Sequence, residues 1–159
     1  MRLVDDDLSH RGSVTEFPPL AELVPHKPPM LLLDRVLSYS TDFVTCEVEI
    51  RADSPFGGTD GVPAIVGVEY MAQCVATYAG LSAREKGQPA RIGFLLGSRE
   101  IRLEADSFPT GTKLTVEARR TWGENDLGSF ACEVRSQSGV LLRGNLTVYQ
   151  GPLPELPSR

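Results

Sequence analysis

Apolar and polar positions alternate in the first third of the chain. Residues 42–53, DFVTCEVEIRAD, alternate cleanly, and residues 31–40, LLLDRVLSYS, are also rich in strand-forming side chains. A period of two residues is typical of a β-strand with one buried face. Thr41 and Asp42, between the apolar parts of the two stretches, allow a hairpin turn. The buried positions of the second strand would be Val44, Cys46, Val48 and Ile50.

A long helix is predicted over about residues 64–86, and it includes most of the apolar stretch GVPAIVGVEYMAQCVATYAG, residues 61–80. Arg84 and Lys86 stand in its last turn, and a glycine and a proline follow, as is common where helices end. Because most sides of this helix are apolar, we expect it to be buried nearly all round. A sheet wrapped around the helix would bury it in this way.

Four further strands are predicted after the helix. They are residues 92–105, 112–123, 127–137 and 139–149, and turn-forming residues separate them. The order of two strands, one helix and four strands indicates an α+β fold, with a single long helix in the concave face of a six-stranded antiparallel sheet. Joining two such sheets edge to edge would remove one pair of exposed edges, so we predict a dimer with a continuous sheet.

Composition indicates one globular domain. The chain has 159 residues, of which 41% are hydrophobic and 23% charged. We expect a loose amino-terminal arm over residues 1–16, a single domain over 17–150 and a proline-rich tail over 151–159. The net charge of −5, without a basic run, argues against nucleic acid or an anionic membrane as a partner.

The cysteines and the apolar runs indicate the compartment. Cys46, Cys74 and Cys132 are odd in number and widely spaced, without a pattern such as CxxC, so we expect reduced thiols and neither a metal nor a cofactor. No apolar run reaches membrane-spanning length and no secretory signal is visible. We therefore expect a cytoplasmic protein without membrane insertion.

One carboxylate, Glu69, stands inside the apolar helix, with Gln73 one helical turn later. Burying a carboxylate without a partner is costly, so a helix that served only as a core would avoid it. The alternative is a carboxylate that reaches solvent in the first turn, where the helix dipole favours it. Gln73 would either orient the carboxyl group or simply form a hydrogen bond at an interface.

Three segments in the same order resemble the hot-dog-fold (3R)-hydroxyacyl-acyl carrier protein dehydratases of the FabA/FabZ type. LVPHKPPMLLLDRV looks like the opening segment of that family, GVPAIVGVEYMAQ like its helix-entry motif, and FLLGSREIRLEADSFPTGTKL like its later strand pair. The match spans about residues 17–149. More narrowly, the chain is similar to the ApeP group, which is associated with aryl polyene synthesis on an acyl carrier protein.

The resemblance implies removal of water from a 3-hydroxyacyl thioester on an acyl carrier protein, which gives a trans-2-enoyl thioester. This reaction needs a base beside the carbonyl group and an acid on the departing oxygen. A carboxyl group on a buried helix can be the acid, which assigns that role to Glu69. The backbone N–H near Gly67 would polarise the thioester carbonyl. The remaining predicted substrate-binding residues are Val68, Ala72 and Gln73.

The base is where this chain departs from the family. The family carries a histidine in a G-H-F-P-like stretch, and here FGGTDGVP has Gly58 or Thr59 at that place. Of the two histidines, His10 lies in the loose arm, and His26 matches a family histidine that is usually structural. His26 is therefore either a residue that pins the backbone or a recruited catalytic base. Asp60 is either a turn residue or a substitute base.

In dehydratases of this family the base and the carboxyl group of one pocket come from different subunits. The resemblance thus implies a partner hot-dog subunit that donates the histidine while this chain donates Glu69. The alternatives are a homodimer that uses His26 with Glu69, a catalytically weak stabilising subunit, an acyl thioesterase, and an acyl-binding regulator without chemistry. A basic rim for the carrier protein, or merely scattered solvated charges, could be formed by Arg84, Lys86, Arg91 and Arg99.

Overall fold

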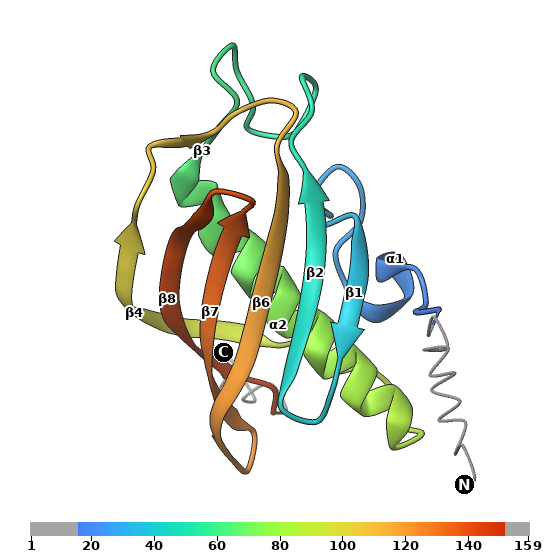
Figure 1. The fold of residues 1–159 in the computed structure, drawn as a ribbon. Helices are drawn as coiled ribbons and strands as arrows, with labels where there is room; N and C mark the ends of the chain where they lie inside the picture. The colour runs from blue at the N-terminus through green and yellow to red at the C-terminus, as the bar shows by residue number, and fades with distance from the viewer. Residues whose placement is uncertain (1–15, 152–159) are drawn as a thin grey trace, which may run out of the picture.

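A single long helix lies along the inner face of a curved six-stranded sheet (Figure 1). The computed structural model describes residues 16–151, so the expected tail, and the expected arm with His10, lie outside the described residues except for Glu16 and Gly151. The helix, α2, runs over Gly67–Glu85 and follows a 3-10 turn at Ala64–Val66. The α+β architecture predicted from the sequence is confirmed.

All neighbouring strands of the large sheet are antiparallel. Their order across the sheet is β1 (Arg35–Tyr39), β2 (Phe43–Glu49), β6 (Lys113–Glu124), β7 (Leu127–Ser136), β8 (Gly139–Tyr149) and β4 (Phe94–Leu103). A short helix, α1 (Leu20–Leu23), precedes the sheet, and β3 (Val62–Pro63) pairs with β5 (Ser107–Phe108) beside the start of α2. The β2–β6 pairing, with Cys46 opposite Val116, joins the two halves of the chain.

The first strand is shorter than the sequence predicted. Residues 31–34 are not part of a strand, and β1 begins only at Arg35. The reason is that the backbone N–H of Leu32 donates to the side chain of Gln73 on α2 and not to a neighbouring strand. This segment is therefore held by the helix, which becomes important for the site.

The core lies between α2 and the concave face of the sheet. The alternation predicted for β2 is confirmed, because Val44, Cys46, Val48 and Ile50 are all buried. Met71 and Cys74 of α2 are fully buried against this face. All three cysteines are buried free thiols, as the sequence indicated.

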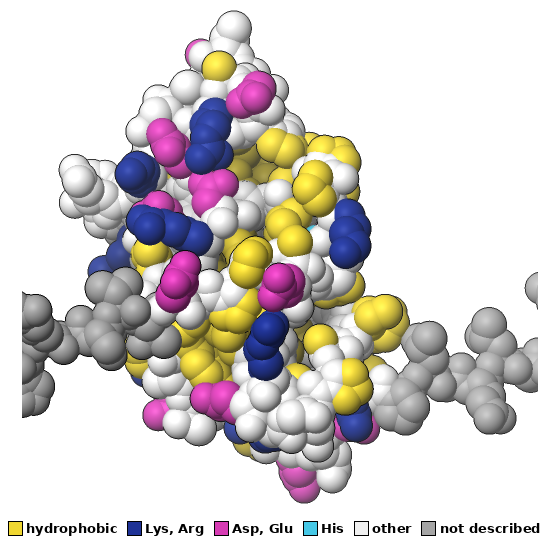
Figure 2. Space-filling model, turned by 90° about the vertical axis from the view of Figure 1, so that its right-hand side faces the viewer, with side chains coloured by type: hydrophobic (Ala, Val, Ile, Leu, Met, Phe, Trp, Pro, Cys, Tyr) yellow, Lys and Arg dark blue, Asp and Glu magenta, His cyan; other side chains and the backbone are white. Residues whose placement is uncertain are grey.

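The helix is not buried all round, which corrects the sequence prediction. Val68, Ala72 and Ala76 are only partly buried, and β4 is exposed over almost its whole length. Seen from the side that carries α1 and β1, the molecule shows many hydrophobic side chains at its surface, interrupted by a few charged ones (Figure 2). An apolar pattern does not distinguish residues that one chain buries from residues that a partner would cover, which explains the error.

Candidate active site

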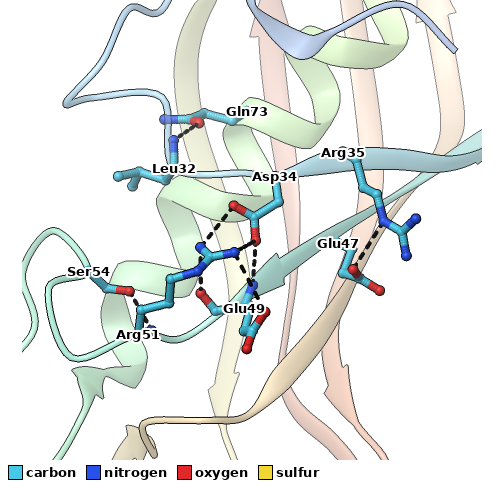
Figure 3. A network of polar contacts seen from close by, with 8 residues as sticks. All are labelled: Leu32, Asp34, Arg35, Glu47, Glu49, Arg51, Ser54 and Gln73. Carbon is cyan, nitrogen blue, oxygen red and sulfur yellow. Dashed lines mark hydrogen bonds and ion pairs between the residues drawn. The ribbon is translucent and has the colours of Figure 1, made fainter.

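The side-chain amide of Gln73 connects α2 to the segment that precedes β1. This amide is fully buried, and its Oε1 accepts the N–H of Leu32 at 2.9 Å (Figure 3). Its Nε2 donates to the carbonyl of Met30 at 2.7 Å and to Oε1 of Glu69 at 3.0 Å. A buried amide must be satisfied in this way, so Gln73 fixes residues 30–32 and the Glu69 carboxyl group together.

Glu69 therefore has one engaged oxygen and one open oxygen. Oε1 accepts from Gln73 and also lies 3.6 Å from Nε2 of His26. Within residues 16–151, Oε2 has no hydrogen-bond partner. The Glu69 side chain is 41% exposed, so this chain by itself does not bury the carboxyl group as we expected from the sequence. The open oxygen is available to a substrate.

His26 reaches Glu69 from the proline-rich segment between α1 and β1. Its side chain is 28% exposed, whereas its Nδ1 atom is buried and has no hydrogen-bond partner among the described residues. Within the part of the chain that the structure describes, neither ring nitrogen has a hydrogen bond to a backbone atom, so no backbone-pinning contact of His26 is seen there. The fold thus brings His26, Glu69 and Gln73 together, and of these contacts only the Glu69–Gln73 spacing was visible in the sequence.

Gly67, predicted to approach the substrate, also serves the packing of the helix start. A Cβ atom there would lie 2.5 Å from Cδ2 of Leu142 and 3.0 Å from Cζ of Phe108, so the helix start packs tightly on the sheet. The Gly67 N–H is directed at the carbonyl groups of Ala64 and Ile65. It is therefore already engaged within the 3-10 turn and is not a free donor for a thioester carbonyl.

A stripe of small and apolar side chains continues from Glu69 along α2. Val68 precedes the carboxylate, and Ala72 and Ala76 follow at helical spacing, all of them only partly buried. Because residues three and four apart share one face of a helix, these side chains form one surface next to the Glu69 carboxyl group. This surface is suited to an acyl chain or to the helix of a second subunit.

The loop before the helix does not replace the missing histidine. Gly58 and Gly61 close a tight turn through reciprocal backbone hydrogen bonds of 2.9 and 3.2 Å, and residues 57–60 are exposed. Asp60 lies at the tip of this turn, which agrees with a turn residue more than with a base. Among the described residues, the loop brings no imidazole to Glu69.

An ion-pair network that the sequence reasoning missed holds the start of this loop (Figure 3). The guanidinium of Arg51 bonds both oxygens of Asp34, at 3.2 and 3.4 Å, and Asp34 also accepts the N–H of Glu49 at 2.7 Å. The Asp34 carboxylate raises the pKa of Arg51. Ser54 accepts the Arg51 N–H at 2.7 Å, so the loop leaves β2 in a fixed direction. Asp34, the charged residue within the apolar LLLDRV segment, is the feature of the sequence that could have indicated this network.

The four cations considered as a basic rim do not gather in one place. Arg84 pairs with Glu22 of α1, Arg91 pairs with Asp126 at the β6–β7 turn, and Arg99 lies in β4. Only Lys86 and Arg91 share a cavity, of ≈ 260 Å³, at the end of α2 remote from Glu69.

No helix within residues 16–151 has both the length and the hydropathy that crossing a membrane requires. The same residues contain no cluster of histidine, cysteine, aspartate and glutamate that could hold a metal ion.

Comparison with known proteins places the chain in a family. A family model described as ApeP-like, ApeP dehydratase, matches residues 18–157. The 3-hydroxyacyl-(acyl-carrier-protein) dehydratase FabZ of Chlamydia pneumoniae is 32% identical over 87% of this chain and 94% of its own length. The FabZ of a Streptococcus thermophilus strain is 28% identical over 83% of this chain and 94% of its own length.

Solved structures agree with this placement. The dehydratase heterocomplex ApeI:P from Xenorhabdus doucetiae contains a chain that superimposes with a TM-score of 0.82 at 31% identity, covering 86% of this chain and 93% of that one. Zebra fish thioesterase superfamily member 2 matches with a TM-score of 0.63 at 14% identity, covering 83% of this chain and 91% of that one, which shows the shared fold only. With the family match over most of its length, this chain belongs to the ApeP-like family of hot-dog-fold dehydratases.

Proposed function

We propose that this chain is a subunit of a dehydratase that removes water from a (3R)-hydroxyacyl thioester carried by an acyl carrier protein, in aryl polyene or fatty-acid-like synthesis. In this proposal Glu69 is the proton-transfer residue that this chain contributes. The observation that carries it is the Glu69 carboxyl group, whose Oε1 is held by Gln73 while Oε2 stays open beside an apolar stripe.

The reaction breaks the C–H bond beside the thioester carbonyl and the C–O bond at the next carbon, and it forms a carbon–carbon double bond between these two carbons. A base takes the proton from the carbon beside the thioester carbonyl, and the hydroxyl on the next carbon leaves with a proton from an acid as water. Glu69 supplies the proton to the departing hydroxyl from its open oxygen. The proton beside the carbonyl lies at another position of the substrate, so a second group must remove it.

A second hot-dog subunit provides that group and covers the open face in our proposal. Two observations support an assembly: the partly exposed stripe on α2, and the exposed edge strand β4, where Phe94, Leu95 and Leu96 are 39%, 47% and 59% exposed. An unpaired edge with apolar side chains is a surface that another strand can pair with. The related dehydratase from Xenorhabdus doucetiae is a heterocomplex, which supports a hetero-assembly over a homodimer.

The test is turnover of a 3-hydroxyacyl carrier-protein substrate by the purified chain, alone and with a candidate second hot-dog subunit from the same organism. Absorbance of the new conjugated thioester reports dehydration, and a free-thiol reagent reports thioester hydrolysis. We expect dehydration that requires the second subunit, without release of thiol. Full activity of the chain alone would contradict the hetero-assembly, and thiol release without an enoyl product would replace the dehydratase by a thioesterase.

A further inference from the structure

His26 has two ring nitrogens in very different surroundings. Nε2 lies 3.6 Å from Oε1 of Glu69, whereas Nδ1 is buried and has no hydrogen-bond partner among residues 16–151. A neutral imidazole carries one N–H, and the partners of the two nitrogens decide which of them holds it.

The proton belongs on Nε2. A proton on Nδ1 would leave a buried N–H without an acceptor, which costs about 1–3 kcal/mol. It would also turn the Nε2 lone pair toward the Glu69 oxygen, so that two acceptors would face each other. With the proton on Nε2, the N–H stands on the nitrogen that lies 3.6 Å from Oε1, and only a lone pair is left unpaired at Nδ1.

This arrangement has a consequence for Glu69. Its Oε1 accepts a hydrogen bond from the Gln73 amide and also faces the Nε2–H of His26 at 3.6 Å, which is ion-pair distance. An oxygen that accepts one hydrogen bond and faces a second N–H is a poor place for the carboxyl proton, so the transferable proton resides on Oε2. Oε2 is the oxygen without a partner in the described chain and the one that a substrate can reach.

The same arrangement excludes His26 as the base. A base needs a lone pair that faces the substrate, and the Nε2 of this tautomer carries a proton. The remaining lone pair, on Nδ1, is buried away from solvent. We infer that His26 is a positioning residue that donates its Nε2–H to Glu69 and directs the transferable proton to Oε2. This inference rests on the proposed role of Glu69 and goes beyond it.

Three substitutions at His26 separate a donor from a base. The amide nitrogen of Gln can stand near the position of Nε2 and donate, but it cannot exchange a proton with substrate. Asn is matched in chemistry, but its shorter side chain places the amide near Nδ1. In the assembly that shows dehydratase activity, we expect His26→Gln to keep kcat within about 10-fold of the parent, since loss of a general base typically costs about 10²–10⁴-fold. We expect His26→Asn and His26→Ala to fall below His26→Gln.

A loss of about 10²-fold or more in His26→Gln, equal to that of His26→Ala and with an unchanged melting temperature, would overturn the inference. Glu69→Gln is the control for the proposed function itself. If Glu69→Gln kept the parental rate, the proposed function would fail whatever the His26 variants showed.

The tautomer can be read without any activity. The chain has two histidines, so ¹⁵N-labelled protein gives two imidazole patterns, and comparison with the His26→Gln variant assigns them. In the neutral ring of His26, recorded at a pH above its titration, we expect a protonated Nε2 and an unprotonated Nδ1. A neutral ring that carries its proton on Nδ1 would contradict the inference.

Discussion

Glu69 and Gln73 lie one turn apart on α2 and share a 3.0 Å hydrogen bond, in which a fully buried amide holds one oxygen of a partly exposed carboxyl group. The same amide bonds the backbone at Met30 and Leu32. The position of the proposed catalytic carboxyl group is therefore coupled to the segment that carries His26, and stability and activity should respond together when Gln73 is changed.

Replacing Gln73 by Met keeps the volume and removes the amide. The Leu32 N–H and the Met30 carbonyl then lose their buried partner, at about 1–3 kcal/mol for each unsatisfied group. We expect the free energy of unfolding to fall by about 2–4 kcal/mol in urea titrations. Gln88→Met, at an exposed position, is the matched control and should change stability by less than about 0.5 kcal/mol. Equal stabilities of the two variants would show that the network around Gln73 does not hold the segment.

Gly67→Ala tests whether this glycine serves packing. The added Cβ would lie 2.5 Å from a Leu142 methyl group, and we expect a loss of about 1–3 kcal/mol in stability from overpacking. Gly58→Ala, where no atom lies within 4 Å of the new Cβ, is the control. A Gly67→Ala protein with parental stability but lowered kcat would instead favour a direct role of this position in binding the substrate carbonyl.

Charge on β4 should prevent assembly without unfolding the chain. Leu95→Lys combined with Leu96→Lys changes two exposed side chains of the edge strand, and native mass spectrometry should show the loss of the complex with the second subunit. Leu37→Lys places one such charge on β1, at the opposite edge of the sheet, and should leave the complex intact, whereas the single variant Leu95→Lys should not. An undiminished complex in the β4 variant would move the interface elsewhere.

Tyr70 should make stability depend on alkaline pH. Burial raises the pKa of Tyr70 to about 12, and the negative charge of Asp34 makes a smaller contribution in the same direction. The pKa of a tyrosine in an unfolded chain is about 10. The folded state therefore keeps the phenolic proton of Tyr70 up to a higher pH than the unfolded state does. The resulting stabilisation is complete below about pH 10 and is lost as the pH rises toward about 12, by up to about 3 kcal/mol.

Urea titrations at pH 8 and pH 11 measure this effect, and Tyr70→Phe should lose less stability between the two values than the parent. An identical pH dependence in Tyr70→Phe and the parent would assign the alkaline loss to other groups. Cys132, whose pKa burial raises to about 12, is one of them.

Local patterns predicted local structure well. The alternation of β2 and the i, i+4 spacing of Glu69 and Gln73 follow from strand and helix periods, and the structure shows both. The exposure of Leu95 and Leu96 could not be foreseen, because an apolar strand at an assembly edge looks like a core strand in the sequence.

Contacts between segments that are distant in the sequence limited how much of the candidate site could be predicted. Nothing near His26 in the sequence shows that it meets Glu69, since that contact depends on how residues 24–32 fold back onto α2. The same holds for Asp34 with Arg51. At Gly67, the sequence shows the absence of a side chain but not whether a ligand or the Leu142 side chain requires it.

The central claim is that Glu69 transfers the proton in dehydration, and Glu69→Gln tests it most directly. This change keeps the size and the hydrogen-bonding capacity of the side chain and removes its exchangeable carboxyl proton. Single-turnover dehydration of a 3-hydroxyacyl carrier-protein substrate should be measured in the active assembly, with Glu124→Gln, at an exposed carboxylate, as the control. We predict a fall of about 10²–10⁴-fold for Glu69→Gln, with unchanged melting temperature and assembly, and no fall for the control. Parental turnover in Glu69→Gln would contradict the account.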